Sequence, residues 1–155
     1  MTEAPETGTR AVVVDASLVA MWVLSEQYSP AALALASHWA RLELQVIAPP
    51  FMMAEVSSAL YKRVRRGELS LEQGLEALEI ALGFGVRTEG EVALSRRALE
   101  LASRFDRPTP YDAHYLALAE LHSCEVWTGD ERLYNAVRLQ LPWVRWIGSY
   151  APSDR

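Results

Sequence analysis

Cysteine, lysine and long apolar runs are all scarce in this 155-residue chain. Its single cysteine, Cys124, cannot form an internal disulfide, which excludes a disulfide-stapled scaffold and favours a reducing, cytoplasmic setting. Of the 15 basic residues only Lys62 is a lysine, so a reaction that needs a lysine elsewhere in the chain is excluded. The first ten residues are polar and no apolar run is long enough for a signal peptide or a membrane span.

Two common kinds of functional motif are also missing. The chain has no Walker loop and no Gly-x-Gly-x-x-Gly, which removes the usual nucleotide-binding signatures. Its three histidines lack metal-ligand spacing, and His114 lies about 200° around a helix from Asp112. The net charge of −5 argues against a general nucleic-acid coat protein, which is usually basic.

The alternation of short apolar runs with segments of helical period predicts one α/β domain, with a central, mostly parallel sheet and helices on both faces. We expect the domain to span 11–149, with a flexible N-terminal tail at 1–10 and a C-terminal tail at 150–155. The expected strands are 11–15, 45–48, 86–88, 125–128 and 143–148, and the expected helices are 16–25, 30–44, 51–66, 70–82, 91–105, 111–122 and 131–139.

Four acids stand at junctions of this pattern. Asp15 ends the first strand, and Asp130 follows Gly129 and opens the helix after a later strand. Because ligands collect beyond the carboxyl ends of parallel strands, we expect these two acids to face one pocket. Asp112 begins one helix and Glu55 lies on another. Converging carboxylates repel one another unless a divalent cation neutralises them, and their hard oxygens suit Mg²⁺ or Mn²⁺.

Each acid also has an ordinary structural explanation. Asp15 and Asp130 could be helix N-caps, which stabilise by about 1 kcal/mol. Asp112, three residues after Thr109, is close to a capping box, and Glu55 could be any glutamate on a helix. Taken singly, these structural explanations stay open.

The local sequences around the four acids are more specific than the acids themselves. They read Val-Val-Asp-Ala-Ser at 13–17, Ala-Glu-Val-Ser-Ser-Ala-Leu at 54–60, Tyr-Asp-Ala-x-x-Leu-Ala-x-Ala at 111–119 and Thr-Gly-Asp-x-x-Leu at 128–133. From about Val12 to Ile147 this set resembles the PIN-domain family, specifically the VapC-type toxins. The resemblance implies a Mg²⁺- or Mn²⁺-dependent ribonuclease, often a homodimer, that is paired with an antitoxin in a type II toxin-antitoxin system.

The four acids then become the predicted catalytic and metal-binding residues. We expect Asp15 and Asp112 to bind the metal directly. Asp130 and Glu55 would bind a second ion or hold metal-bound waters, one of which attacks the phosphorus of the RNA substrate. Two hydroxyl side chains that flank the strand-end acids would hydrogen-bond the carboxylates or those waters, or else cap locally: Ser17 and Thr128. The number of ions stays open.

A basic cluster follows Glu55 on the same predicted helix. Its members are either an ordinary solvated face or a substrate-binding surface for the RNA backbone: Lys62, Arg63, Arg65 and Arg66.

Apolar helix residues from the first half of the chain should form an exposed surface for self-association, as a homodimer or higher homo-oligomer, and for the antitoxin. We place six residues on this surface: Trp22, Leu33, Leu35, Trp39, Leu60 and Tyr61.

Two alternative functions are weighed against the nuclease. A catalytically inactive PIN-like RNA-binding or scaffold protein would be expected to lose some of its acids, yet all four are present. A phospho-acceptor or phosphatase domain would need a lysine after a late strand and a second acid near the first, and the chain has neither. The RNA target, and RNA against DNA, stay open.

Overall fold

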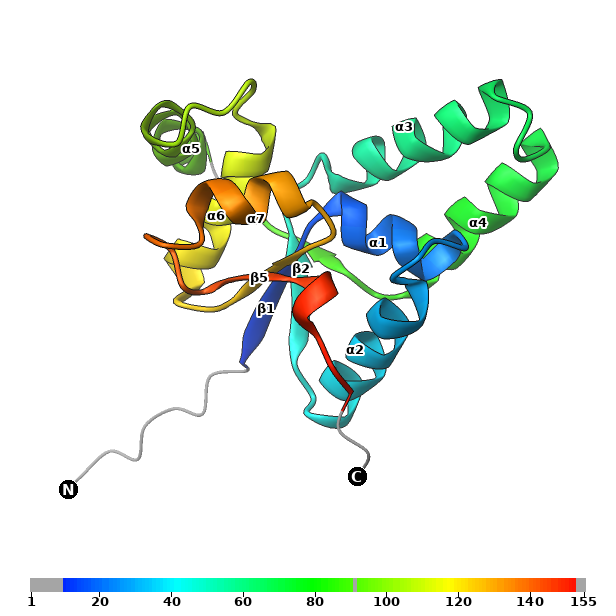
Figure 1. The fold of residues 1–155 in the computed structure, drawn as a ribbon, viewed down its shortest axis with the longest axis horizontal. Coiled ribbons are helices and arrows are strands. Elements are labelled where there is room, and N and C mark those ends of the chain that lie inside the picture. The colour runs from blue at the N-terminus through cyan, green and yellow to red at the C-terminus, as the bar shows by residue number, and fades with distance from the viewer. Residues whose placement is uncertain (1–9, 91, 153–155) are drawn as a thin grey trace.

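A parallel β-sheet forms the centre of the molecule (Figure 1). The computed structural model describes residues 10–90 and 92–152. Across the sheet the strand order is β3-β2-β1-β4-β5, and every neighbouring pair is parallel, as the sequence predicts. The strands are β1 (Ala11–Val14), β2 (Gln45–Ala48), β3 (Arg87–Thr88), β4 (Val126–Thr128) and β5 (Val144–Trp146).

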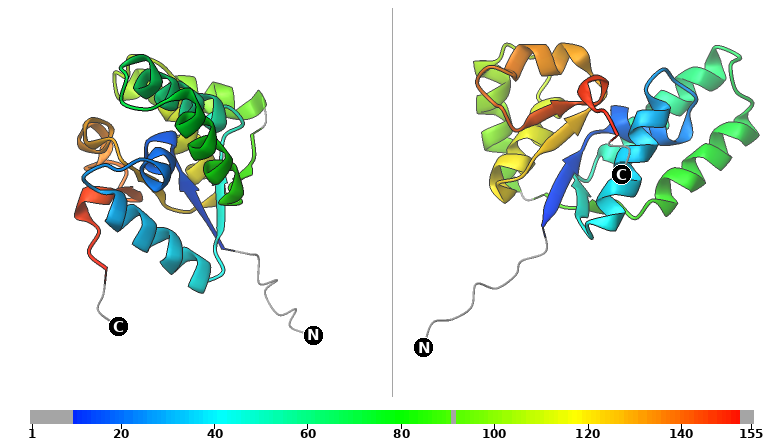
Figure 2. Two further views of the ribbon diagram at one scale, coloured as in Figure 1. Left: turned by 90° about the vertical axis from the view of Figure 1, so that its right-hand side faces the viewer. Right: turned by 60° about the horizontal axis from the view of Figure 1, so that its bottom comes forward.

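The helices lie on the two sides of this sheet. Helices α5, α6 and α7 are grouped on one side and α1 to α4 on the other, where α3 and α4 form a hairpin that extends away from the sheet (Figures 1 and 2). Their bounds are α1 (Ala16–Val23), α2 (Ser29–Arg41), α3 (Met52–Arg65), α4 (Leu71–Gly83), α5 (Val92–Arg104), α6 (Tyr111–His122) and α7 (Glu131–Val137), and a 3₁₀ turn covers Ile147–Ser149. No helix in the described ranges is long and apolar enough to cross a membrane.

Local signals explain most of these boundaries. Ser70 and Gln73 form a reciprocal capping box at the start of α4, and Gly67 takes a positive φ of 74° just beyond α3. The second helix differs from expectation at both ends. Ser29 does not cap it but donates to the Leu24 carbonyl at 2.6 Å, and the helix ends at Arg41 because Glu43 turns left-handed.

The predicted tails fall mostly on residues outside the described ranges, so the domain bounds stay a prediction. Tyr150, at the predicted start of the C-terminal tail, packs edge-on against Trp127 with ring centroids 5.7 Å apart.

The prediction of an exposed apolar surface in the first half of the chain is largely wrong. Four of its six residues are buried in the core, and only Leu33 and Tyr61 are exposed. The reason is that α1 and α2 pack on each other and on the sheet, so that Trp22 meets Trp39 edge-on and stacks on Phe84. Exposed apolar side chains lie instead along α4: Leu71, Leu75, Ile80 and Leu82.

Candidate active site

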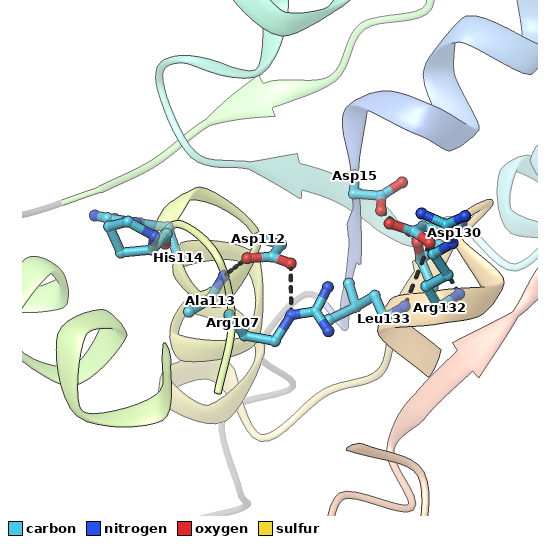
Figure 3. A network of polar contacts seen from close by, with 10 residues as sticks. Asp15, Arg107, Asp112, Ala113, His114, Asp130, Arg132 and Leu133 are labelled. Atoms are coloured by element: carbon cyan, nitrogen blue, oxygen red, sulfur yellow. Dashed lines mark hydrogen bonds and ion pairs between the residues drawn. The ribbon is translucent and has the colours of Figure 1, made fainter. Parts of the chain in front are cut away.

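Two acids meet at the carboxyl edge of the sheet. Asp15 follows β1 and Asp130 follows β4, and these strands are neighbours in the sheet. Their carboxylates face each other in Figure 3. They are close enough for the charge of Asp130 to help raise the pKa of Asp15. The strand-end pattern in the sequence therefore identified a real convergence.

Asp15 is a buried carboxylate held by neutral donors. It is only 6% exposed, and its Oδ1 accepts from the Ser17 hydroxyl at 2.6 Å and from the Leu18 amide at 3.0 Å. Its Oδ2 accepts from the Thr128 hydroxyl at 2.5 Å. Burial raises the pKa of Asp15 to about 6, although these hydrogen bonds oppose the rise. A charge at this position therefore has only neutral hydrogen-bond donors among the residues that the structure describes.

The two hydroxyls also bind the loop that carries Asp130. The Gly129 amide donates to the Ser17 hydroxyl, and the Asp130 amide donates to the Thr128 hydroxyl, both at 2.9 Å. From the sequence we expect these hydroxyls either to cap locally or to contact the acids and metal-bound waters. In the structure each hydroxyl touches Asp15 and also fixes the strand-to-helix turn.

Asp130 caps helix α7 with one of its two carboxylate oxygens. Its Oδ1 accepts from the amides of Arg132 and Leu133 at the start of α7. Its Oδ2 accepts no hydrogen bond from the residues that the structure describes. The capping role therefore leaves one oxygen available to a ligand.

Glu55 is oriented by a tyrosine that is not among the residues predicted from the sequence. The hydroxyl of Tyr115, on α6, donates to Glu55 Oε1 at 2.6 Å. Tyr115 is 2% exposed, and burial first, then the bond to Glu55, raises its pKa far above the usual value, so it remains a donor. The charge of Asp15 adds to this rise, so Tyr115 is close to both acids. One available signal was its position one turn after Asp112 on the same helix.

Asp112 has a charged partner. Its Oδ2 accepts from Arg107 Nε at 3.0 Å and its Oδ1 from the Ala113 amide at 3.1 Å (Figure 3). The structural alternative of a capping box with Thr109 does not form: Pro110 occupies the N-cap position of α6, with no side-chain cap. Proline lacks the amide that a returning carboxylate would bind, so Asp112 is available to Arg107 instead.

The acids fit a hard divalent cation, although they do not form a compact ligand cluster. In residues 10–90 and 92–152, no three His, Cys, Asp or Glu side chains gather in the arrangement of a metal site. Asp130 acts on Asp15 through its charge, while Tyr115 holds Glu55 and Arg107 holds Asp112. Mg²⁺ commonly uses one or two carboxylates directly and keeps several waters, so this donor set is sufficient.

A hollow of about 350 Å³ connects Glu55 with part of the basic cluster. Its lining includes Glu55, Lys62, Arg63 and Arg66, but not Arg65. Positions 55, 62 and 66 follow the helical repeat, so Glu55 and Lys62 share one face of α3 and Arg66, the C-cap residue, continues it.

Ion pairs divide this cluster further. Arg63 binds Glu26 at 2.7 Å and Glu68 at 3.0 Å, and Arg66 lies 3.5 Å from Glu68. The charge of Arg63 is thus already paired with two carboxylates of the protein. Lys62 and Arg66 are the exposed cations in line with Glu55.

Comparisons with known proteins agree with this geometry. The profile of the PIN-domain family matches residues 12–139. Over 94 residues the chain is 31% identical to VapC ribonuclease Mb0985 of Mycobacterium bovis and to ribonuclease VapC9 of Mycobacterium tuberculosis, covering 61% of this chain and 72% of each relative.

Two crystal structures are similar in fold. VapC20 of Mycobacterium tuberculosis, described as a sarcin-ricin loop cleaving toxin, has a TM-score of 0.59 and 19% identity, covering 81% of this chain and 94% of that one. PAE2754 of Pyrobaculum aerophilum has a TM-score of 0.60 and 22% identity, covering 82% and 84%.

Proposed function

The chain belongs to the PIN-domain family, in its VapC-type group, and on that basis we propose that it is a metal-dependent endoribonuclease, the toxin of a type II toxin-antitoxin pair. The observation that carries the proposal is the buried carboxylate of Asp15, which lies against neutral donors and beside Asp130. Such a charge is costly in a desolvated place unless a cation or a proton joins it.

Asp15, Asp130 and Asp112 are the residues that would hold Mg²⁺ or Mn²⁺, with Asp15 as the central ligand. When bound, the cation supplies counter-charge for the acids and for the phosphate and lowers the pKa of water. Glu55 keeps Oε2 without a partner among the described residues, because Tyr115 binds only Oε1. That oxygen can accept a hydrogen bond or a proton from the attacking water. Hydrolysis then joins the water oxygen to phosphorus, breaks one phosphorus–ribose oxygen bond and returns a proton to the leaving oxygen.

The groove along α3 is the proposed path of the RNA backbone. Lys62 and Arg66 line the same hollow as Glu55. They would therefore bind phosphates and guide the RNA strand to the acids. The same contacts would serve single-stranded DNA, because phosphate contacts carry no base information.

Exposed apolar surface on α4 is the proposed contact for a second copy of the chain or for the antitoxin. Leu71, Leu75 and Leu82 repeat with helical spacing on its exposed face. Nearby, a largely apolar hollow of about 460 Å³ is lined by residues that include Trp22, Leu33 and Phe84 and by none of the four acids. An amphipathic helix is the kind of partner that such a surface accepts.

The activity test compares purified protein with Mg²⁺, with Mn²⁺ and with EDTA on a mixture of structured and unstructured RNAs, with matching DNAs alongside. We expect RNA cleavage that requires the divalent ion and is strongly reduced in Asp15→Asn. Binding without any cleavage under all three conditions would favour the inactive RNA-binding protein instead.

The partner test uses light scattering of the purified chain and co-expression with the neighbouring gene. A monomer at micromolar concentration would contradict self-association. Failure of the neighbouring product to copurify or to inhibit would contradict the antitoxin pairing while leaving the nuclease proposal intact.

A further inference from the structure

Arg107 is a basic side chain that is paired with one of the four acids, Asp112. It lies in the short connection between α5 and α6, where Asp106 takes a left-handed φ of 50° and Pro108 follows. Its amide donates to the Ala102 carbonyl at 2.9 Å. Its side chain is only 13% exposed and is fixed through Nε to Asp112. Both the backbone and the side chain of this arginine are therefore held in place.

Only one edge of the guanidinium is used by the protein. The contact with Asp112 engages Nε, and neither terminal amino group has an acceptor among the residues that the structure describes. In Figure 3 these amino groups point away from Asp112, on the side where Asp15 and Asp130 lie. In the described part of the chain, two polar side-chain atoms are fully buried without a hydrogen-bond partner, and both are indole nitrogens, of Trp127 and Trp146. The amino groups of Arg107 are not among them, so they keep some contact with solvent. They therefore keep N–H donors that no described residue occupies.

We propose that Arg107 is a phosphate-binding residue, which takes a phosphodiester of the RNA backbone next to the bond that is cleaved. The inference rests on the proposed nuclease function and adds a subsite to it. A guanidinium presents several N–H donors in a rigid fork, so one edge can hold Asp112 while another binds two phosphate oxygens. Because Asp112 already fixes the side chain, little rotamer entropy is lost when the phosphate binds. Lysine has a single ammonium group and cannot make both contacts with the same geometry.

The experiment measures RNA binding and metal binding separately. Arg107→Gln and Arg107→Lys are made in an Asp130→Asn background, so that a fluorescein-labelled single-stranded RNA of mixed sequence stays intact in Mg²⁺. Anisotropy titrations between 50 and 300 mM KCl give the salt slope of the affinity, and calorimetry gives the affinity for Mn²⁺. Arg97→Gln is the matched control, because Arg97 binds Glu120 at 2.7 Å in a similar ion pair on α5.

We expect Arg107→Gln to weaken RNA binding about fivefold or more and to lower the log–log salt slope by about 0.7, the value for one phosphate contact on a single strand. Mn²⁺ affinity should not fall, and Arg97→Gln should change neither quantity. Arg107→Lys keeps the charge beside Asp112, so it tests the idea even if the glutamine variant is poorly folded, and it should also show a reduced slope.

An unchanged slope in Arg107→Gln, or a fully normal slope in Arg107→Lys, would overturn the proposal and leave Arg107 as a counter-ion of Asp112. The slope is measured without cleavage, so a chain that fails to cut RNA would contradict the nuclease proposal but not this binding result.

Discussion

Asp15 and Asp112 precede or open helices in similar ways, yet their surroundings are opposite. Asp15 is buried and accepts from two hydroxyls and one amide, all of them neutral. Asp112 is a quarter exposed and is paired with the guanidinium of Arg107 at 3.0 Å. Neutral donors orient a carboxylate but leave its charge uncompensated, whereas an arginine compensates it.

The two acids should therefore contribute differently to metal binding and to substrate binding. Asp15 has the greater need for an external cation, so it should dominate metal affinity. Asp112 already has an internal cation, so its effect on metal should be smaller and its effect on the substrate should depend on Arg107.

The largest expected effect comes from Asp15→Asn. An amide keeps the size of the side chain and can still cap α1, but it removes the charge. Cleavage should fall by roughly 10³-fold, equivalent to about 4 kcal/mol of transition-state stabilisation, and Mn²⁺ affinity should fall with it. Asp112→Asn should also reduce cleavage but should weaken Mn²⁺ binding less. Calorimetry and initial rates check both variants, and circular dichroism confirms their folding. Equal losses of Mn²⁺ affinity would break the comparison.

The pH dependence of stability should report the same difference without any substrate. The pKa of Asp15 is raised from 3.8 to about 6 by burial, so in EDTA the folded protein holds this proton more tightly than the unfolded chain does. The stability that the proton provides is present below about pH 4 and is lost as the pH rises towards 6 and beyond. The shift corresponds to about 3 kcal/mol.

Urea denaturation in EDTA checks this loss. The Asp15→Asn variant should lack it and should be more stable than the parent chain at pH 7.5. Mn²⁺ affinity of the parent chain should rise between pH 5 and 7, because the ion competes with the proton. If the difference in unfolding free energy between the two proteins did not change with pH across this range, then burial does not raise the pKa of Asp15.

Tyr115→Phe tests whether a neutral hydroxyl donor orients Glu55. The substitution removes only the hydroxyl, so the ring packing in the core is kept while Glu55 loses its partner. A hydrogen bond to a charged group is worth about 1.5–3 kcal/mol, so kcat should fall about tenfold or more with little change in KM. Tyr61→Phe, at an exposed position on α3, is the control and should have normal kinetics. A rise in KM at constant kcat would assign Tyr115 to substrate binding instead.

Much of this arrangement could be predicted from sequence because it depends on local signals. Buried apolar runs marked the strands, and the acids after β1 and β4 had to converge once the sheet was parallel. The contacts of Tyr115 and Arg107 were not predictable in the same way. Tyr115 and Glu55 are 60 residues apart and meet only through the packing of α6 and α3 against the site.

The misplaced apolar surface has a similar cause. The sequence showed that Trp22 and Trp39 were apolar but not that α1, α2 and the end of α4 would enclose them. Likewise, nothing local indicated that Glu26 would bind Arg63 and withdraw it from the basic cluster.

The smallest expected effect concerns that cluster, and it compares two exposed cations that line the hollow beside Glu55 with one that does not line it. Replacing both Lys62 and Arg66 with alanine should lower the salt slope of RNA binding by about 1.4, or about 0.7 for each lost phosphate contact. Arg65→Ala is the matched control, because Arg65 is exposed on the same helix but does not line the hollow beside Glu55. Mn²⁺ affinity should be unchanged in both proteins. If the control lowers the slope as much per charge as the double variant does, then the cluster acts only as a diffuse solvated face, and the groove beside Glu55 does not guide the RNA.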